Sequence, residues 1–85
     1  AERAVVGGFA YSGQVCIHAQ RFIVQESVYN EFVKRVVEKT KQLVIGDPLD
    51  NSTQVSSMID AANSQRVLDW IDEAKAGGAV VHCGG

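Results

Sequence analysis

The sequence predicts an α/β fold, and the order of its apolar segments supports this prediction. Two short segments rich in β-branched and apolar residues, 21–25 and 79–83, enclose two longer amphipathic segments, 28–44 and 60–76. Strand, helix, helix and strand with short connections is typical of a right-handed crossover between two strands of a parallel sheet. Because two parallel strands cannot cover themselves, we expect the chain to be part of something larger.

The first element is expected to be a helix over residues 2–10. Its apolar residues recur at helical spacing, although Gly7 and Gly8 each cost about 1 kcal/mol relative to alanine inside a helix. The run that follows, YSGQVC, is polar and contains Gly13, which indicates a loop. This loop leads to the first expected strand, RFIVQ at 21–25, whose β-branched and aromatic residues favour extended backbone.

The second helix is expected to begin after Ser27, which is a suitable N-cap residue. Apolar residues recur along it at helical spacing, with charged residues on the opposite side. Glu31 lies near its start and Lys39 near its end, an order that suits the helix dipole. Gly46 and Pro48, in IGDP, are expected to end this helix.

The third helix is expected from Asp60 to Ala76, with Val67 and Ile71 on its apolar side. Gly77 would supply the left-handed residue that ends it. The second strand, AVVHC at 79–83, follows directly. These elements complete the predicted crossover.

Composition and charge exclude several classes of protein. The 85 residues are 46% hydrophobic and 21% charged, with a net charge of -2 and no basic cluster, which argues against nucleic acid or an anionic membrane surface as a partner. The chain contains no apolar run long enough to span a membrane and no signal-peptide pattern, so we expect a cytoplasmic protein. Its two cysteines, Cys16 and Cys83, are far apart, and no spacing indicates a metal site.

Cys16 is the residue on which the functional prediction depends. A thiol just after a glycine-containing loop, flanked by backbone N–H groups, can be held as a thiolate and attack a carbonyl carbon. Free cysteine is also among the most buried residue types, so a small α/β binding or adaptor module with a structural thiol remains an alternative. A thiol redox protein is disfavoured because no second cysteine lies nearby.

The segment FAYSGQVCIHAQR, residues 9–21, resembles the active-site cysteine signature of the NAD(P)-dependent aldehyde dehydrogenase superfamily. That signature has an aromatic residue, then Gly-Gln, one residue, the cysteine, and an arginine further on. The likeness continues through FIVQE, YNEFV, VIGDPLD and RVLDWIDEAKAGGAVVHCGG. The resemblance therefore covers residues 1–85 and implies a fragment of the catalytic domain, without the cofactor-binding domain.

The resemblance implies an enzyme in which Cys16 is the nucleophile. The thiolate would add to an aldehyde, the thiohemiacetal would give its hydride to NAD or NADP, and water would hydrolyse the thioester to release a carboxylic acid. The backbone N–H of Cys16 would donate to the oxyanion, and Gly13 and Gln14 would shape the loop around the sulfur.

The same resemblance places other parts of the machinery outside the chain, including the general-base glutamate and an oxyanion-binding asparagine. We therefore expect the chain alone to be inactive, with no cofactor bound to it and no metal site. In the parent enzyme, which we expect to be a homo-oligomer, the partners would be an aldehyde and NAD or NADP.

Two further residues are candidates for substrate binding. His18 lies two residues after the cysteine, where it could narrow the substrate pocket, pair with the thiolate or face a neighbouring strand. Arg21 could bind substrate or form a structural ion pair. The pair Gln20-Arg21 resembles members that act on lactaldehyde, succinate semialdehyde or, without phosphorylation, glyceraldehyde 3-phosphate.

Overall fold

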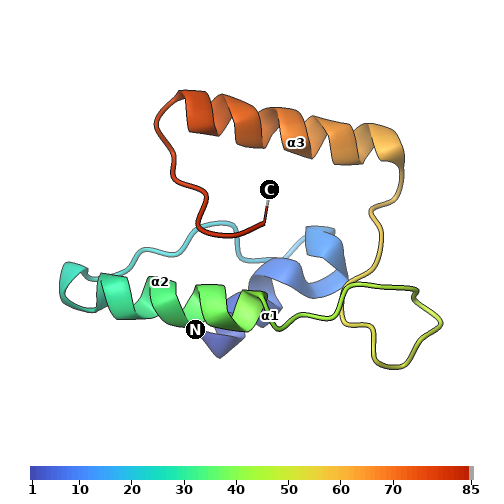
Figure 1. Cartoon of the computed structure of the whole chain (residues 1–85), viewed down its shortest axis with the longest axis horizontal. Coiled ribbons are helices and arrows are strands. Elements are labelled where there is room, and N and C mark those ends of the chain that lie inside the picture. The colour runs from blue at the N-terminus through green and yellow to red at the C-terminus, as the bar shows by residue number, and fades with distance from the viewer. Residues whose placement is uncertain (85) are drawn as a thin grey trace.

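The computed structural model describes residues 1–84, in which the regular elements are helices joined by loops. Helix α1 spans Glu2–Phe9, a 3₁₀ turn (η1) follows at Ala10–Gly13, and helices α2 and α3 span Glu26–Thr40 and Ala61–Ala76. Figure 1 shows α1 beside α2 and α3 apart from both. No helix in the described residues is both long enough and apolar enough to cross a membrane.

Helix α1 confirms the helix expected at 2–10 and ends one residue earlier, at Phe9. Its Val5 is 4% exposed and is the single buried side chain within residues 1–84. Helix α1 packs against α2, and an exposed ion pair joins Lys39 Nζ to Glu2 Oε2 at 3.7 Å. The small core of the described chain therefore lies between these two helices.

Helix α2 begins earlier and also ends earlier than the sequence predicts. Gln25, in extended conformation, occupies the N-cap position without a side-chain hydrogen bond, so the prediction of Ser27 as the cap was wrong. The helix ends at Thr40, well before Gly46. Tighter turns follow, in which the N–H of Gln42 donates to Lys39 and that of Leu43 to Thr40, and Ile45 then forms an isolated parallel bridge with Val55.

Helix α3 confirms the third predicted helix, and both of its ends are capped locally. The Asp60 carboxylate accepts hydrogen bonds from the backbone N–H of Asn63 at 2.7 Å and from its side chain at 2.9 Å. These bonds, the backbone one first, hold the pKa of Asp60 below its ordinary value.

The C-terminal cap of α3 corrects one detail of the prediction. The left-handed residue is Gly78, with φ 98°, and not Gly77, with φ -79°. The N–H of Ala79 donates to the carbonyl of Ala74 at 2.9 Å and that of Gly78 to Lys75 at 3.0 Å, which is a Schellman motif.

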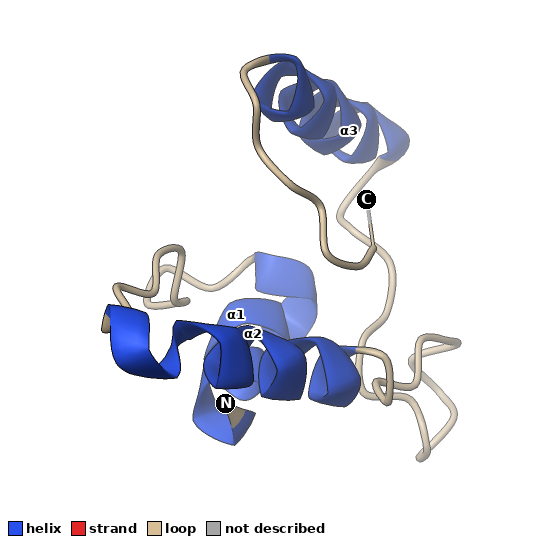
Figure 2. Cartoon of the chain, turned by 60° about the vertical axis from the view of Figure 1, so that its left-hand side comes forward, coloured by secondary structure: helices blue, strands red, loops and turns tan. Residues whose placement is uncertain are grey.

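The structure does not show the predicted strand-helix-helix-strand crossover. Segments 21–25 and 79–83 are loops in the described chain, drawn in tan in Figure 2, and neither pairs with another strand. A strand exists through hydrogen bonds to a neighbouring strand, and β-branched composition alone does not supply that neighbour. The α/β layout is therefore a prediction that residues 1–84 do not bear out.

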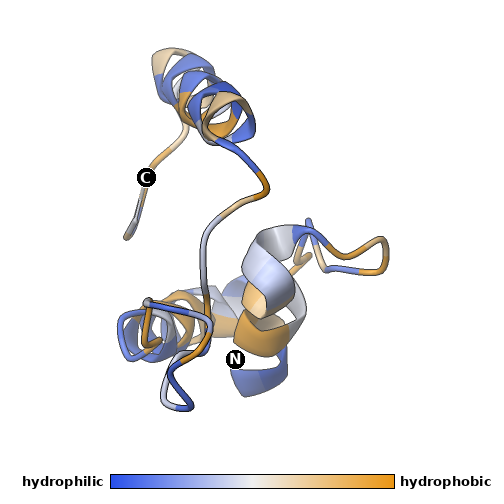
Figure 3. Ribbon diagram, turned by 90° about the vertical axis from the view of Figure 1, so that its right-hand side faces the viewer, coloured by the Kyte–Doolittle hydropathy of each residue, from blue (hydrophilic) through white to orange (hydrophobic). Residues whose placement is uncertain are grey.

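Many apolar side chains consequently remain in contact with solvent. Ile23 is fully exposed, Trp70 is 59% exposed and Val80 is 74% exposed. Figure 3 shows hydrophobic residues along α3 as well as on α1 and α2, although α3 contacts neither helix within the described residues. These side chains offer a large apolar surface to whatever packs against them.

Candidate active site

The polar loop that the sequence predicts after α1 is a tight left-handed turn. Tyr11 has φ 52° and ψ 38°, Ser12 has φ 58° and ψ 31°, and Gly13 has φ 72°. Glycine enters this region freely, whereas other residues incur a cost of roughly 1–2 kcal/mol each. Contacts elsewhere must therefore stabilise the conformation of Tyr11 and Ser12.

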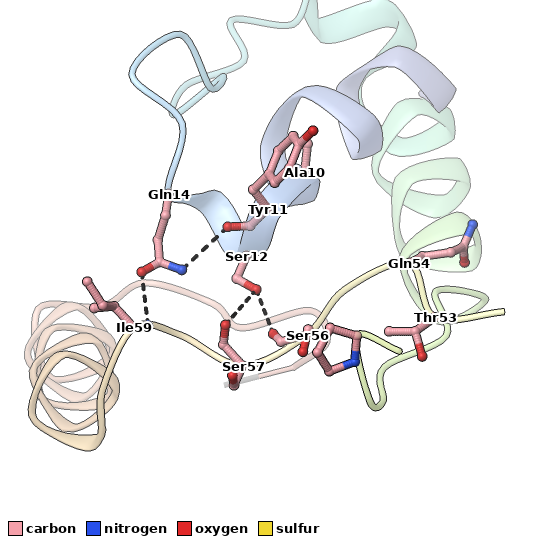
Figure 4. A pocket seen from close by; sticks show the side chains of 10 residues that line it. Ala10, Tyr11, Ser12, Gln14, Thr53, Gln54, Ser56, Ser57 and Ile59 are labelled. Atoms are coloured by element: carbon pink, nitrogen blue, oxygen red, sulfur yellow. Dashed lines mark hydrogen bonds between the residues drawn. The ribbon is translucent and has the colours of Figure 1, made fainter. Parts of the chain in front are cut away.

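Two side chains of this turn bind a segment that is distant in sequence, residues 56–59 (Figure 4). Ser12 Oγ donates to the carbonyl oxygen of Ser56 at 2.6 Å and makes a longer contact of 3.4 Å with that of Ser57. Gln14 Oε1 accepts from the backbone N–H of Ile59 at 3.1 Å. The left-handed turn is thus attached to the 56–59 segment at two points.

A groove of about 630 Å³ lies between the left-handed turn and residues 48–59. It is lined by Ala10, Tyr11, Ser12, Gln14, Pro48, Thr53, Gln54, Ser56, Ser57 and Ile59, most of which carry hydroxyl or amide groups (Figure 4). Cys16 does not line this groove. This groove and the candidate nucleophile are therefore separate.

Cys16 is exposed and sits in a reverse turn over residues 15–18. The N–H of His18 closes this turn by donating to the carbonyl of Val15 at 3.0 Å. Within the described chain, the N–H groups of Cys16 and Ile17 have no hydrogen-bond acceptor. Neither N–H is therefore engaged in a hydrogen bond within the described residues.

The ring of His18 is engaged with the same turn. Its Nδ1 lies 2.7 Å from the carbonyl oxygen of Val15. Because a carbonyl oxygen can only accept, the hydrogen-bonded tautomer carries its proton on Nδ1 and leaves Nε2 as an acceptor. This contact is local, and it differs from the strand-facing position considered for His18 above.

The turn over residues 15–18 is also attached to α1 on its downstream side. The N–H of Ala19 donates to the carbonyl of Gly7 at 2.8 Å. Arg21, the other candidate for substrate binding, is exposed and belongs to none of the ion pairs found in residues 1–84. No group of three potential metal ligands occurs in the described part of the chain.

Sequence reasoning singled out Gly13, Gln14 and Cys16 but missed Ser12 and the 56–59 segment. In the sequence Ser12 is one polar residue of a polar loop, and nothing in the local pattern indicates a partner 44 residues away. A left-handed serine directly before a glycine is visible only in the structure.

Comparison with known proteins gives a consistent result over the whole chain. The model of the aldehyde dehydrogenase family matches residues 1–85. A betaine aldehyde dehydrogenase of Brucella anthropi is 42% identical over 82 residues, which are 96% of this chain and 17% of that protein. The rat (Rattus norvegicus) protein named aldehyde dehydrogenase, cytosolic 1, is 43% identical over 84 residues, which are 99% of this chain and 17% of that protein.

The chain thus spans about 17% of the length of these curated relatives. Neither relative is named for a hydroxyaldehyde or a semialdehyde, so the subtype resemblance remains a prediction. The match of the family model to every residue, and the identity with two enzymes from distant organisms, establish the relationship. The chain belongs to the aldehyde dehydrogenase family.

Proposed function

We propose that these residues form part of the catalytic domain of an NAD(P)-dependent aldehyde dehydrogenase, which oxidises an aldehyde to a carboxylic acid, and that Cys16 is its nucleophile. The observation that carries this proposal is the position of Cys16, which is exposed in a turn where the N–H groups of Cys16 and Ile17 have no acceptor within the described residues. Family membership supports the reaction class.

The chemistry of the first step follows from this position. The Cys16 proton passes to a general base, which the family resemblance places outside this chain. The thiolate then forms a bond to the aldehyde carbon while the C=O π electrons move onto the oxygen. The N–H of Cys16 donates to that oxyanion, and the N–H of Ile17 is a second available donor.

Residues 1–84 do not fit a nicotinamide dinucleotide. A dinucleotide pyrophosphate binds at a glycine-rich turn between a strand and a helix N-terminus. In this chain Gly7 and Gly8 lie inside α1, while Gly77 and Gly78 end α3. If the enzyme uses NAD or NADP as hydride acceptor, its binding residues must lie elsewhere.

The remaining properties of the complete enzyme are proposed on the same basis. In the complete enzyme, the loops 21–25 and 79–83 would pair with strands from outside this chain, and that pairing would cover Ile23 and Val80.

A cytoplasmic location is supported by the rat relative, whose name calls it cytosolic. The homo-oligomeric state remains a prediction. The alternative of a module with a buried structural thiol is disfavoured because Cys16 is exposed.

The test replaces Cys16 in the complete enzyme. With betaine aldehyde or propanal as substrate, Cys16→Ser should lower kcat for NAD(P)H formation about a thousandfold or more, because the nucleophile is lost. Cys83→Ala is the matched control and should retain activity within about twofold, since nothing in the resemblance gives Cys83 a role.

Two results would contradict the proposal. Retained activity in Cys16→Ser would place the nucleophile elsewhere. Aldehyde-dependent NAD(P)H formation by the 85-residue chain alone would show that it needs no machinery from outside.

A further inference from the structure

The hydroxyl of Ser12 joins two parts of the chain that are 44 residues apart in sequence. Its oxygen lies 2.6 Å from the carbonyl oxygen of Ser56, a short distance for a hydroxyl-to-carbonyl hydrogen bond (Figure 4). The bond is partly shielded from water. It therefore differs from the hydrogen bonds that an exposed serine makes with water alone.

The backbone of Ser12 is also unusual. It is left-handed, it follows the left-handed Tyr11, and it precedes Gly13, so the chain reverses within three residues. Left-handed non-glycine residues persist where the surrounding structure holds them, and they occur preferentially at functional sites. At Ser12 the group that holds the backbone is its own hydroxyl, through Ser56.

This turn sets the position of the cysteine that follows it. Gln14 adds a second attachment to the 56–59 segment through the N–H of Ile59. After Cys16, the N–H of Ala19 attaches the chain to α1 at Gly7. The sulfur is thus carried by a short connection that is fixed on both sides, and Ser12 forms the shortest of these attachments.

We propose that Ser12 is a positioning residue for Cys16. By donating to the Ser56 carbonyl it fixes the left-handed turn, and the turn fixes the place from which the sulfur meets the carbonyl carbon. This inference rests on the proposed role of Cys16 as nucleophile. A reacting pair must lie about 3–3.5 Å apart in a suitable orientation, and a displacement of about 1 Å can reduce the rate about a hundredfold.

The experiment measures acylation of Cys16 directly, in the complete enzyme and without cofactor. The probe is p-nitrophenyl acetate: the thiolate bonds to the acetyl carbon, p-nitrophenolate leaves, and an acetyl thioester remains on the sulfur. The burst of p-nitrophenolate gives a maximal acylation rate constant and a half-saturating ester concentration. Circular dichroism of each variant reports whether its helices are intact.

Three substitutions distinguish the effect of losing the Ser12 hydroxyl from the effect of changing its backbone conformation. Ser12→Ala removes the donor and keeps the backbone cost, whereas Ser12→Gly removes the donor and relieves that cost. Both should lower the maximal acylation rate constant about tenfold and leave the half-saturating concentration within about twofold. Ser12→Asn should retain at least about half of the rate, because asparagine tolerates left-handed backbone and its amide can donate to Ser56.

Ser57→Ala is the matched control. The carbonyl of Ser57 accepts the longer contact from Ser12, but the hydroxyl of Ser57 makes no hydrogen bond within the described residues. The acylation rate of Ser57→Ala should therefore equal that of the unmodified enzyme. If Ser12→Ala loses helicity, Ser12→Gly decides the question, because it imposes no backbone strain.

The possible failures are distinguishable. Acylation that persists in Cys16→Ser overturns the proposed function and this inference with it. Acylation that depends on Cys16 but is as fast in Ser12→Gly as in the unmodified enzyme overturns only the role of Ser12. The same conclusion follows if Ser12→Asn is impaired as strongly as Ser12→Ala.

Discussion

Residues 1–59 and residues 60–84 are held together in different ways. The first region depends on contacts between distant segments: α1 packs on α2, Ile45 pairs with Val55, and Ser12 bonds to Ser56. The second region consists mainly of α3, whose two ends are capped by its own neighbours. The two regions should therefore respond to different substitutions, and the candidate site belongs to the first.

The largest difference should come from a change in the left-handed turn. Gly13→Ala places a side chain on backbone with φ 72° and should destabilise the first region by roughly 1–2 kcal/mol. The resonances of α3 should not change. A urea titration followed by amide NMR measures the two regions separately.

Gly7→Ala is the matched glycine substitution in the same region. An added Cβ there would lie 3.6 Å from the Cβ of Ala19, an ordinary contact, and alanine favours helix, so stability should rise by about 0.5–1 kcal/mol. If Gly13→Ala unfolds α3 in parallel with α1, the separation into two regions is incorrect.

A smaller effect is expected from the N-cap of α3 as the pH falls. Hydrogen bonds from Asn63 lower the pKa of Asp60 below its ordinary value of 3.8. A lowered pKa in the folded state stabilises the helix above 3.8, and this contribution is lost as the pH falls through the folded-state value. Acid titration should therefore reduce the helicity of α3 below about pH 4.

Asp60→Asn should remove this dependence, because asparagine caps a helix without titrating. Glu31→Gln is the control in the other region. The hydrogen bond from Arg35, at 2.6 Å, lowers the pKa of Glu31 in the same direction, so this control should change the acid response of α2 alone. If α3 lost helicity over the same pH range in Asp60→Asn as in the unmodified protein, Asp60 would not be the group responsible for the acid response.

The smallest effect concerns the surface of α3. The guanidinium of Arg66 lies 4.5 Å from the ring centre of Trp70, a cation–π contact. Arg66→Gln should destabilise α3 by about 0.5 kcal/mol at this exposed position. Trp70 is the single tryptophan of the chain, so its fluorescence during urea unfolding reports this change. An identical midpoint in both proteins would show that the contact contributes nothing.

The same contrast explains how much the sequence could predict. Helix α3 was predicted closely, because Asp60 and the glycine pair at its end are local signals. The end of α2 was not, because the helix gives way to tighter turns directly after Thr40, where the sequence carries neither glycine nor proline. Strand formation at 21–25 and 79–83 depends on neighbours that composition does not identify.

For the candidate site, the sequence indicated the cysteine and its loop but not what holds that loop. The resemblance rests on FAYSGQVCIHAQR at 9–21 and on the segments that follow it, and these patterns say nothing of the contacts between distant residues. The attachment of Ser12 to Ser56 depends on tertiary structure, and no short pattern encodes it. Side chains that act across long sequence separations are therefore the part of the site that sequence reasoning misses.

The bond between Gly7 and Ala19 has a consequence for the order of folding. It closes a loop of about a dozen residues, whereas the bond between Ser12 and Ser56 closes one of 44. The longer closure costs about 1 kcal/mol more in chain entropy, and a loop of about ten residues closes in about 10–100 ns. We expect the turn that carries Cys16 to assemble on α1 first, before the 56–59 segment reaches it.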